Sequence, residues 1–444
     1  MWARRITALA ATLLLAAGAA APARAQEQPN LLVIMTDDQR ADGTLAVMPQ
    51  TRRAIARQGR RFVQAYTTTP KCCPSRASFF TGRYPHNHRV VSNLVARRLD
   101  HTTTVQYLVR AEGYRTGMFG KFLNGWPIAL DPPYFDEWAI MSPGYRRATW
   151  NIDGLVADRA DYTTDLIADR AVQFVRDGER EDEQPWLAWV TPYAPHLPST
   201  PADRHRGASL PRLKRTPAMF EADWSDKPEL LDRARGFRRA RRKMRRAGRR
   251  SLMAVDDLVG RLVHELRVRG ERRQTLVVFT SDNGFLLGEH GGLTGKDLPH
   301  PASAQIPLLL RWPGRVRPGT VSTDLVLNID VGTTLLRAAG VPVETDGRSL
   351  LARRPRAGIF LEHSGGRRRE PDALPIPAWR ALVTPSFRYA EYYEDDALVG
   401  REYYDHLVDP WELENRADEL DPLREAALSA SLGAYSECTG STCP

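Results

Sequence analysis

The stretch PNLLVIM (residues 29–35), followed directly by TDD (residues 36–38), indicates the fold class of this chain. A short and uninterrupted apolar run is typical of a strand that is buried on both faces of a parallel sheet. The stretch TLVVFT (residues 275–280) repeats the pattern and is followed by SDNG (residues 281–284). Each run therefore predicts a central strand that is followed directly by residues with oxygen-bearing side chains.

The rest of the chain alternates between strand and helix patterns. Residues 251–268 carry one stripe of leucine and valine side chains, which predicts an amphipathic helix. Similar patterns predict strands at 113–119, 186–191, 306–311 and 323–329, and helices at 48–64 and 162–175. This alternation predicts an α/β sheet with its functional loops at the carboxyl ends of the strands.

The C-terminal part has a different pattern. From 345 to 357 the composition turns to Gly, Arg and Pro, which predicts a connecting loop. Beyond it, strand-like pieces lie at 358–362, 381–383 and 387–393, and a helical pattern lies at 422–435. We therefore expect a main domain over residues 26–345 and a smaller α+β subdomain over residues 346–444.

The N-terminus predicts export. Arg4 and Arg5 precede an Ala/Leu-rich run that ends in Ala23-Arg24-Ala25, the form that signal peptidase cuts. A membrane anchor is the alternative, but the apolar run barely reaches the length of a span, and no later stretch is apolar enough. We expect a signal peptide at 1–25 and a secreted or extracytoplasmic mature protein without a membrane span.

The composition and charge limit the class of protein. With 42% hydrophobic and 26% charged residues, the 444-residue chain is typical of globular proteins and unlike a disordered chain. The formal charge is +10, or +7 without the three arginines of residues 1–25. Eleven of the eighteen residues 233–250 are Lys or Arg, so this run is either a polyanion-binding segment or the solvated face of a helix. We expect no specific nucleic-acid partner.

The four cysteines form two pairs. Cys438 and Cys443 can close a small disulfide loop in an exported chain. Cys72 and Cys73 are adjacent, so a bridge between them would strain the backbone, and they lack the CxxC spacing of zinc sites. They call for another explanation.

Oxygen donors follow both central strands. Asp37-Asp38 and Asp282-Asn283 should converge, because the carboxyl ends of parallel strands meet at one edge of a sheet. Carboxylate and amide oxygens suit a hard cation such as Ca²⁺ or Mg²⁺. The alternative is that these pairs serve as helix caps or turns.

The most specific motif is CCPSRASFFTGR (residues 72–83). It resembles the sulfatase signature CxPSR followed by TGR, with matches at Cys72, Pro74, Ser75, Arg76, Thr81, Gly82 and Arg83. In that family a separate formylglycine-generating enzyme reads this context in the unfolded chain and oxidises the first cysteine to formylglycine. The resemblance implies that this partner converts Cys72 before export, and that Cys73 remains a buried free thiol.

A phosphatase-type CxxxxxR loop would be the alternative for an unmodified thiol. Six residues after Cys72 stands Ser78, and six after Cys73 stands Phe79, so that loop is absent. Conversion has a chemical reason, because a thiol attacking a sulfate ester would form an intermediate without easy release. A hydrated aldehyde has two hydroxyls, one to attack sulfur and one to expel sulfate afterwards.

Other landmarks appear in the order of the sulfatase family: DDQR, GK, APH, SDNG, GEH and a second GK, at 37–40, 120–121, 194–196, 281–284, 288–290 and 295–296. The resemblance covers residues 29–340, and residues 404–415 resemble the family's closing segment. It implies an alkaline-phosphatase-like fold, with a mainly parallel sheet flanked by helices and a C-terminal α+β subdomain.

The resemblance also implies roles for single residues. A divalent cation, Ca²⁺ or alternatively Mg²⁺, would be held by modified Cys72 together with Asp37, Asp38, Asp282 and Asn283. Arg76 would orient the hydrated aldehyde, and Lys121 and Lys296 would neutralise sulfate oxygens. His196 is the candidate for protonating the leaving alcohol, with a surface loop imidazole as its alternative.

Some positions depart from the arylsulfatases. Leu123 stands where many of them have a histidine, and the GKxLN form more closely resembles N-acetylglucosamine-6-sulfatase and its bacterial relatives. Asn124 and His290 are candidate substrate contacts, and His86 and His88 are candidates for the pocket rim. We therefore expect a sulfatase acting on sulfated carbohydrate. The alternatives are a phosphonate monoester or phosphodiester hydrolase of the same superfamily, or a non-catalytic polyanion-binding protein.

Overall fold

The computed structural model describes residues 28–181, 184–235, 241–352, 355–365 and 375–444. The expected signal peptide at 1–25 lies outside the described residues. Across the described ranges, every helix is too short or too polar to cross a membrane.

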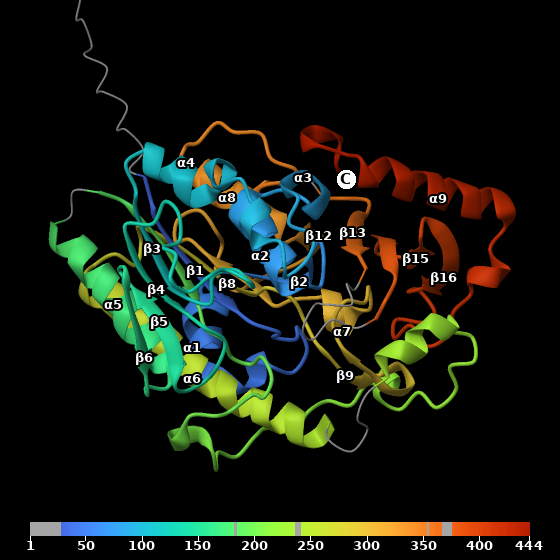
Figure 1. Ribbon diagram of the computed structural model, residues 1–444, viewed down its shortest axis with the longest axis horizontal. Coiled ribbons are helices and arrows are strands. Elements are labelled where there is room, and N and C mark those ends of the chain that lie inside the picture. Colours follow the sequence, from blue (N-terminus) through green and yellow to red (C-terminus); the bar gives the residue numbers. More distant parts are fainter. Residues whose placement is uncertain (1–27, 182–183, 236–240, 353–354, 366–374) are drawn as a thin grey trace, which may run out of the picture.

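A mixed sheet of ten strands forms the centre of the molecule (Figure 1). Its strand order is β12-β2-β11-β8-β1-β7-β3-β4-β5-β6. The central strands β8, β1, β7, β3 and β4 run parallel, whereas β11 and the edge strands β5 and β6 pair antiparallel. The strands span β1 Asn30–Thr36, β2 Arg60–Tyr66, β3 Arg115–Gly120, β4 Glu137–Met141, β5 Ala148–Ile152, β6 Leu155–Arg159, β7 Trp186–Thr191, β8 Thr275–Ser281, β11 Leu308–Arg311 and β12 Thr320–Leu327.

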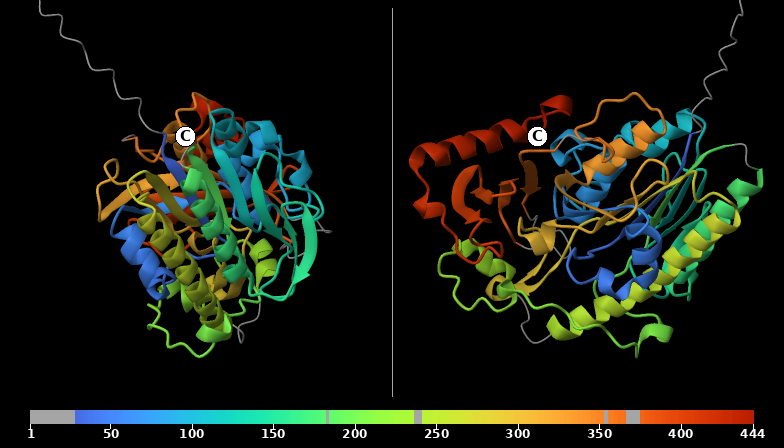
Figure 2. Two further views of the ribbon diagram at one scale, coloured as in Figure 1. Left: turned by 90° about the vertical axis from the view of Figure 1, so that its left-hand side faces the viewer. Right: turned by 180° about the vertical axis from the view of Figure 1, so that it is seen from behind.

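Helices cover both faces of this sheet (Figures 1 and 2). Alternate residues of β1 point to opposite sides, so Leu31 and Val33 join one core and Leu32 and Ile34 join the other. The first core contains residues of α2 (Cys72–Thr81), α4 (Val105–Ala111) and α8 (Ile329–Ala338). The second contains residues of α5 (Thr163–Glu181) and α6 (Arg241–Val268). The fold is a three-layer α/β arrangement, as predicted.

The helix predicted at 48–64 is wrong over its second half. The chain forms α1 (Pro49–Thr51) and the π-helical turn η2 (Arg52–Ala56), and then enters β2. β2 is held between β11 and β12, and these tertiary hydrogen bonds override the local helical spacing. Gly59 permits the change of structure, because a Cβ there would lie 2.1 Å from the carbonyl oxygen of Leu310.

The C-terminal part forms a second, antiparallel sheet of four strands beside the carboxyl edge of the first, with α9 packed against it (Figure 1). Its elements are β13 Ile359–Ser364, β14 Ala378–Val383, β15 Phe387–Glu394, β16 Ala397–Asp405 and α9 Pro422–Ser436. Three further short elements are α3 Pro85–His88, α7 Pro301–Ala304 and the hairpin of β9 Leu286–Glu289 with β10 Leu293–Gly295. The expected α+β character and the Cys438–Cys443 disulfide are confirmed. The domain boundary near residue 345 stays a prediction.

Candidate active site at the carboxyl edge of the sheet

The oxygen donors predicted at two strand ends do come together. β1 and β8 pair in parallel with Thr36 opposite Ser281, so the residues that follow each strand are neighbours. The Asn283 amide Nδ2 donates to Asp38 Oδ1 at 2.5 Å, and the Asp38 backbone N–H donates to Asp282 Oδ1 at 3.1 Å. All four side chains are buried.

Cys72 begins helix α2, whose residues are all buried. Its Sγ lies 3.5 Å from Asp37 Oδ1 and 2.6 Å from Lys296 Nζ. Two later residues of the helix attach it to the end of β8. Ser75 Oγ donates to the Asp282 carbonyl at 2.5 Å, and Arg76 Nε donates to Asp282 Oδ2 at 2.8 Å. The contiguous signature therefore places its cysteine directly against the oxygen donors.

Cys73 lies beside this centre, and it is buried and not disulfide-bonded, as predicted. Its backbone N–H donates to Asn93 Oδ1, and its Sγ faces the backbone carbonyl of Asn124 at 3.6 Å. The side-chain Oδ1 of Asn124 is buried and accepts no hydrogen bond. Asn124 is thus adjacent to the first turn of α2 and has an acceptor available.

Three buried cations balance the carboxylates. Lys121 Nζ lies 2.5 Å from Asp37 Oδ2, Lys296 Nζ lies 2.6 Å from Asp38 Oδ1, and Arg76 Nη2 lies 3.7 Å from Asp37 Oδ2. Burial by itself raises the pKa of Asp37, but the positive charges around it, led by Lys121, outweigh this effect and bring the pKa to about 2. Asp37 is therefore a carboxylate at any physiological pH.

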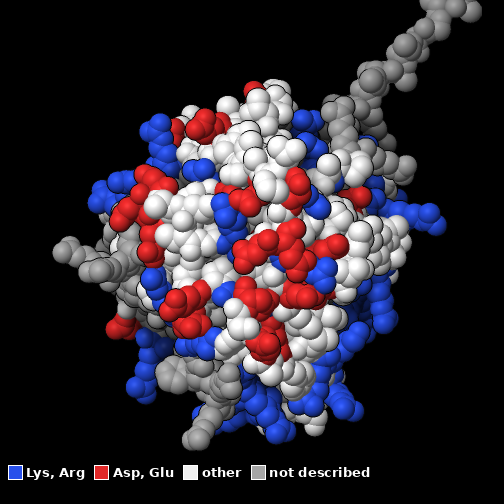
Figure 3. All heavy atoms as spheres, turned by 90° about the vertical axis from the view of Figure 1, so that its right-hand side faces the viewer, with Lys and Arg blue, Asp and Glu red and all other residues white. Residues whose placement is uncertain are grey.

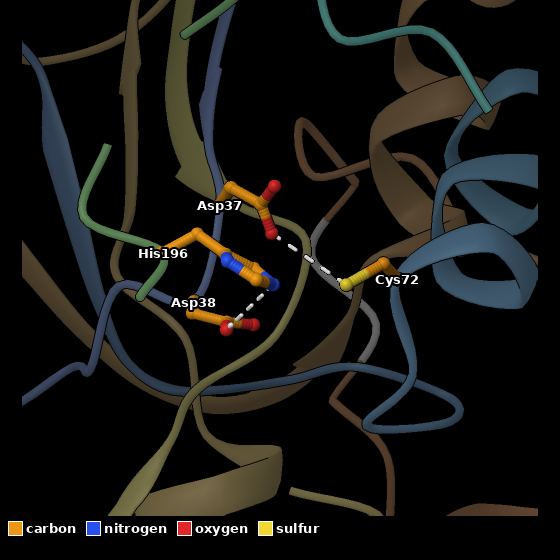
Figure 4. A group of neighbouring side chains, drawn as sticks. All are labelled: Asp37, Asp38, Cys72 and His196. Atoms are coloured by element: carbon orange, nitrogen blue, oxygen red, sulfur yellow. Dashed lines mark hydrogen bonds and ion pairs between the residues drawn. The ribbon is translucent and has the colours of Figure 1, made fainter. Parts of the chain in front are cut away.

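His196 points toward the two aspartates, across from Cys72 (Figure 4). Its Nε2 lies 3.6 Å from Asp38 Oδ2, while its Nδ1 lies 2.7 Å from the Tyr193 hydroxyl and 2.8 Å from the Leu197 carbonyl. These contacts fix the ring and leave Nε2 directed into the site. The sequence did not identify Tyr193 as a positioning residue, although it is part of the PYAPH run.

The carboxylate and amide oxygens of this cluster fit a hard divalent cation. One ligand atom from each of Asp37, Asp38, Cys72 and His196 lies within 4.8 Å of the others. Asp38 Oδ2 and Asn283 Oδ1 are buried without a hydrogen-bond partner, and such orphaned oxygens are what a cation would satisfy. Burial raises the pKa of the Cys72 thiol, and Lys121 and Lys296 only partly oppose this effect. An unmodified thiol would therefore be a poor nucleophile here.

The other candidate histidines lie away from this cluster. His290 is buried with His300 and Glu412, and its Nδ1 lies 2.9 Å from Glu221 Oε2. His86 pairs with Glu362 at 2.8 Å and lines a cavity together with Arg89 and Arg98. His88 is buried against Ser78 Oγ at 2.9 Å, and burial lowers its pKa to about 3.

In the described part of the basic run 233–250, most of the basic side chains contact other residues of the protein. In α6, Arg245 pairs with Glu289, and three further arginines donate to backbone carbonyls: Arg241 to Gly288, Arg249 to Pro211 and Arg250 to Ala208. Residues 236–240 lie outside the described residues. On the face formed by the C-terminal sheet, acidic side chains gather in the middle and basic ones toward the rim (Figure 3). That face is unsuited to spreading a polyanion over its centre.

Known proteins resemble this chain over most of its length. Residues 29–341 match the family model described as Sulfatase, and residues 288–428 match that of the N-sulphoglucosamine sulphohydrolase C-terminal region. The Extracellular sulfatase SULF-1 homolog of Drosophila melanogaster is 35% identical over 77% of this chain, but the match spans only 34% of that relative. The N-acetylglucosamine-6-sulfatase of Homo sapiens is 29% identical over 94% of this chain and 86% of its own.

Solved structures share the fold. A protein in complex with its substrate D-glucosamine-2-N,6-O-disulfate superposes with a TM-score of 0.76 at 23% identity, over 92% of this chain and 97% of that one. The phosphonate monoester hydrolase of Silicibacter pomeroyi reaches a TM-score of 0.72 at 25% identity, over 91% and 94%. The expected alkaline-phosphatase-like fold is confirmed. The Sulfatase family model matches more than half of the chain, so the chain belongs to the sulfatase family.

Proposed function

We propose that this protein is a secreted sulfatase that hydrolyses sulfate esters of carbohydrate, of the N-acetylglucosamine-6-sulfate type. The observation that carries the proposal is the position of Cys72 Sγ, which lies 3.5 Å from Asp37 and 2.6 Å from Lys296 within one buried cluster. The likeness to the human N-acetylglucosamine-6-sulfatase over 94% of the chain supports the substrate class.

Formylglycine derived from Cys72 would supply the nucleophilic hydroxyl, and a divalent cation, Ca²⁺ or Mg²⁺, would stabilise negative charge on it and on the sulfate. Asp37, Asp38, Asp282 and Asn283 would hold that cation with their oxygens. Arg76 keeps its contacts with Asp282 and the Lys121 carbonyl, so it would orient residue 72 on the first turn of α2. The formylglycine-generating enzyme would act before export.

The two lysines would bind the sulfate. Lys121 and Lys296 approach the cluster from two different loops, and both contact a carboxylate while lying near residue 72. Charge on the sulfate oxygens shifts during transfer, and fixed ammonium groups in a dry site stabilise that shift without reorganising. His196, with its Nδ1 held by Tyr193 and Leu197, would deliver a proton from Nε2 to the leaving alcohol.

The decisive experiment compares substrates on protein exported from a host that has the modifying enzyme. We expect hydrolysis of N-acetylglucosamine-6-sulfate and of an aryl sulfate. In the same preparation, mass spectrometry of the peptide that contains Cys72 should show the lower mass of formylglycine. An active protein with an unmodified Cys72 thiol would contradict the mechanism.

A phosphonate monoester or phosphodiester hydrolase is the second candidate, and its basis is the fold shared with the Silicibacter pomeroyi enzyme at 25% identity. Preferential turnover of an aryl phosphodiester over the aryl sulfate would favour it. A polyanion-binding protein without activity would bind heparin as wild type and as Cys72→Ala, and would hydrolyse none of these esters.

A further inference from the structure

A cavity of about 450 Å³ lies where the carboxyl edge of the large sheet meets the C-terminal subdomain. Its walls come from the chain after β1, the ends of β2 and β9, and the turns after β14 and β16. Small-molecule sites in proteins have volumes of about 300–1,000 Å³. This cavity, which we call the large cavity, is therefore big enough to hold a sugar ring.

A smaller cavity of about 50 Å³ adjoins both the large cavity and the oxygen donors of the candidate active site. Asp38 is part of its wall, and so are the two residues on either side of His196. Asp38 Oδ1 lies 2.6 Å from Lys296 Nζ, which contacts Cys72 Sγ at the same distance. The small cavity therefore begins at the groups to which we assign sulfate transfer.

Two segments of the chain lead from the small cavity to the large one. After β1, Arg40 and Asp42 line both cavities. After β8, Leu287 lines the small cavity and Glu289 lines the large one. Arg40 joins the two segments, because its Nη1 pairs with Glu289 Oε1 at 3.0 Å. Asp42 follows Asp38 by four residues, so their Cα atoms are at most about 14 Å apart. A short chain of sugars covers that distance.

Several side chains of the large cavity are accessible and suit a sugar ring. Trp411 is 39% exposed and presents an indole to a ligand. The Asp42 side chain is 44% exposed, and Arg40 Nε fixes it by donating to its Oδ1 at 2.8 Å. Lys214 is exposed on the same wall, to which His290, a substrate contact predicted from the sequence, also belongs. An aromatic face beside a few fixed polar groups is the usual composition of a small-molecule pocket.

We propose that the large cavity is a subsite for the sugar unit next to the one that carries the scissile sulfate, with Trp411 stacked on the face of its ring. The proposal rests on the sulfatase function proposed above, and it extends the substrate from a single sulfated sugar to an oligosaccharide. Hydroxyl groups of this unit would donate to Asp42, and Lys214 would pair with a carboxylate or sulfate on it. A monosaccharide or an aryl sulfate would fill only the end at Cys72, so it gains nothing from the subsite.

The test compares N-acetylglucosamine-6-sulfate with a tetrasaccharide that ends in the same sulfated sugar. We expect the wild type to have the higher kcat/KM on the tetrasaccharide, and Trp411→Ala to lower that value by about tenfold. The values for the monosaccharide and for an aryl sulfate should change by less than about twofold, because neither reaches the indole. Trp411→Phe keeps an aromatic face and should recover part of the loss. Leu407→Ala is the matched control, since Leu407 is a 76% exposed apolar residue of the same segment and does not line this cavity.

A second arm does not require turnover. In Cys72→Ala protein, calorimetry should show that Trp411→Ala weakens the binding of the tetrasaccharide by a similar factor and leaves the binding of the monosaccharide unchanged. Equal kcat/KM of the wild type on the two saccharides would overturn the subsite. So would a Trp411→Ala protein that keeps its kcat/KM and affinity for the tetrasaccharide, or that loses equally on both saccharides. Wild-type protein that hydrolyses neither saccharide nor the aryl sulfate would overturn the proposed function instead, and the binding arm would then decide the subsite by itself.

Discussion

Replacing Lys296 by methionine tests the centre of the site most directly. Its Nζ lies 2.6 Å from both Asp38 Oδ1 and Cys72 Sγ, and its side chain is 8% exposed. Burial alone would lower the pKa of Lys296, but Asp38 and the other anionic groups hold it well above its usual value, so the ammonium stays charged. Loss of one preorganised donor in a buried site costs about 10²–10³ in kcat, or about 2.7–4 kcal/mol. We therefore expect the kcat of Lys296→Met to be about 10²–10³ lower than that of the wild type.

The assay is kcat for an aryl sulfate at saturating substrate, with the formylglycine fraction and the bound cation measured in the same samples. Arg356→Met is the matched control, because Arg356 is also a buried cation and pairs with Asp330 through two contacts of 2.6 Å, away from Cys72. It should lower the thermal midpoint, since breaking a buried pair costs about 3–5 kcal/mol, but keep the kcat of the folded protein. A Lys296→Met enzyme that keeps its modification and its cation and retains more than about a tenth of the wild-type kcat would refute the assigned role.

Three further outcomes are expected. Cys72→Ala should abolish hydrolysis whereas Cys73→Ala should keep it, as measured on the aryl sulfate; the reverse result would move the nucleophile to Cys73. Chelation with EDTA should remove activity, and titration with Ca²⁺ or Mg²⁺ should restore it and identify the cation; full activity in the metal-free protein would contradict the ligand set. Arg388→Met should destabilise the protein by about 3–5 kcal/mol at pH 7, because it strands the buried carboxylates of Glu402 and Glu412. Burial raises the pKa of Glu412, but Arg388 and His406 outweigh this effect and hold the pKa far below its usual range. In the wild type, ionised Glu412 therefore contributes its full stabilisation of the folded state above about pH 4.3, and this stabilisation is lost as pH falls toward the folded pKa. Without Arg388 that pKa rises, and the deficit in the urea midpoint should shrink as pH is lowered from 7 to 5; a deficit independent of pH would contradict this account.

The local sequence pattern predicted those elements whose hydrophobic residues can be stable only when they are buried in the core. The runs at 29–35 and 275–280 are apolar on both faces, and such segments are stable only inside a covered sheet. The stripe in 251–268 likewise became the buried side of α6. The segment 48–64 failed because β2 is half-buried and mixed in polarity, and its strand state depends on β11 and β12. A strand whose stability depends on pairing with segments far away in the sequence is poorly predicted from its own residues.

By itself, the sequence identified the residues that we propose carry the chemistry, because the CCPSR signature is contiguous and the oxygen donors directly follow recognisable strands. Only the tertiary structure decided how they meet: parallel pairing of β1 with β8 joins residues more than 240 positions apart, and α2 brings Cys72 against them. It also decided that His290 lies in a separate buried cluster. The physical reason is that side-chain convergence depends on sheet register and on the packing of two sheets, and neither is encoded in the spacing of a single segment.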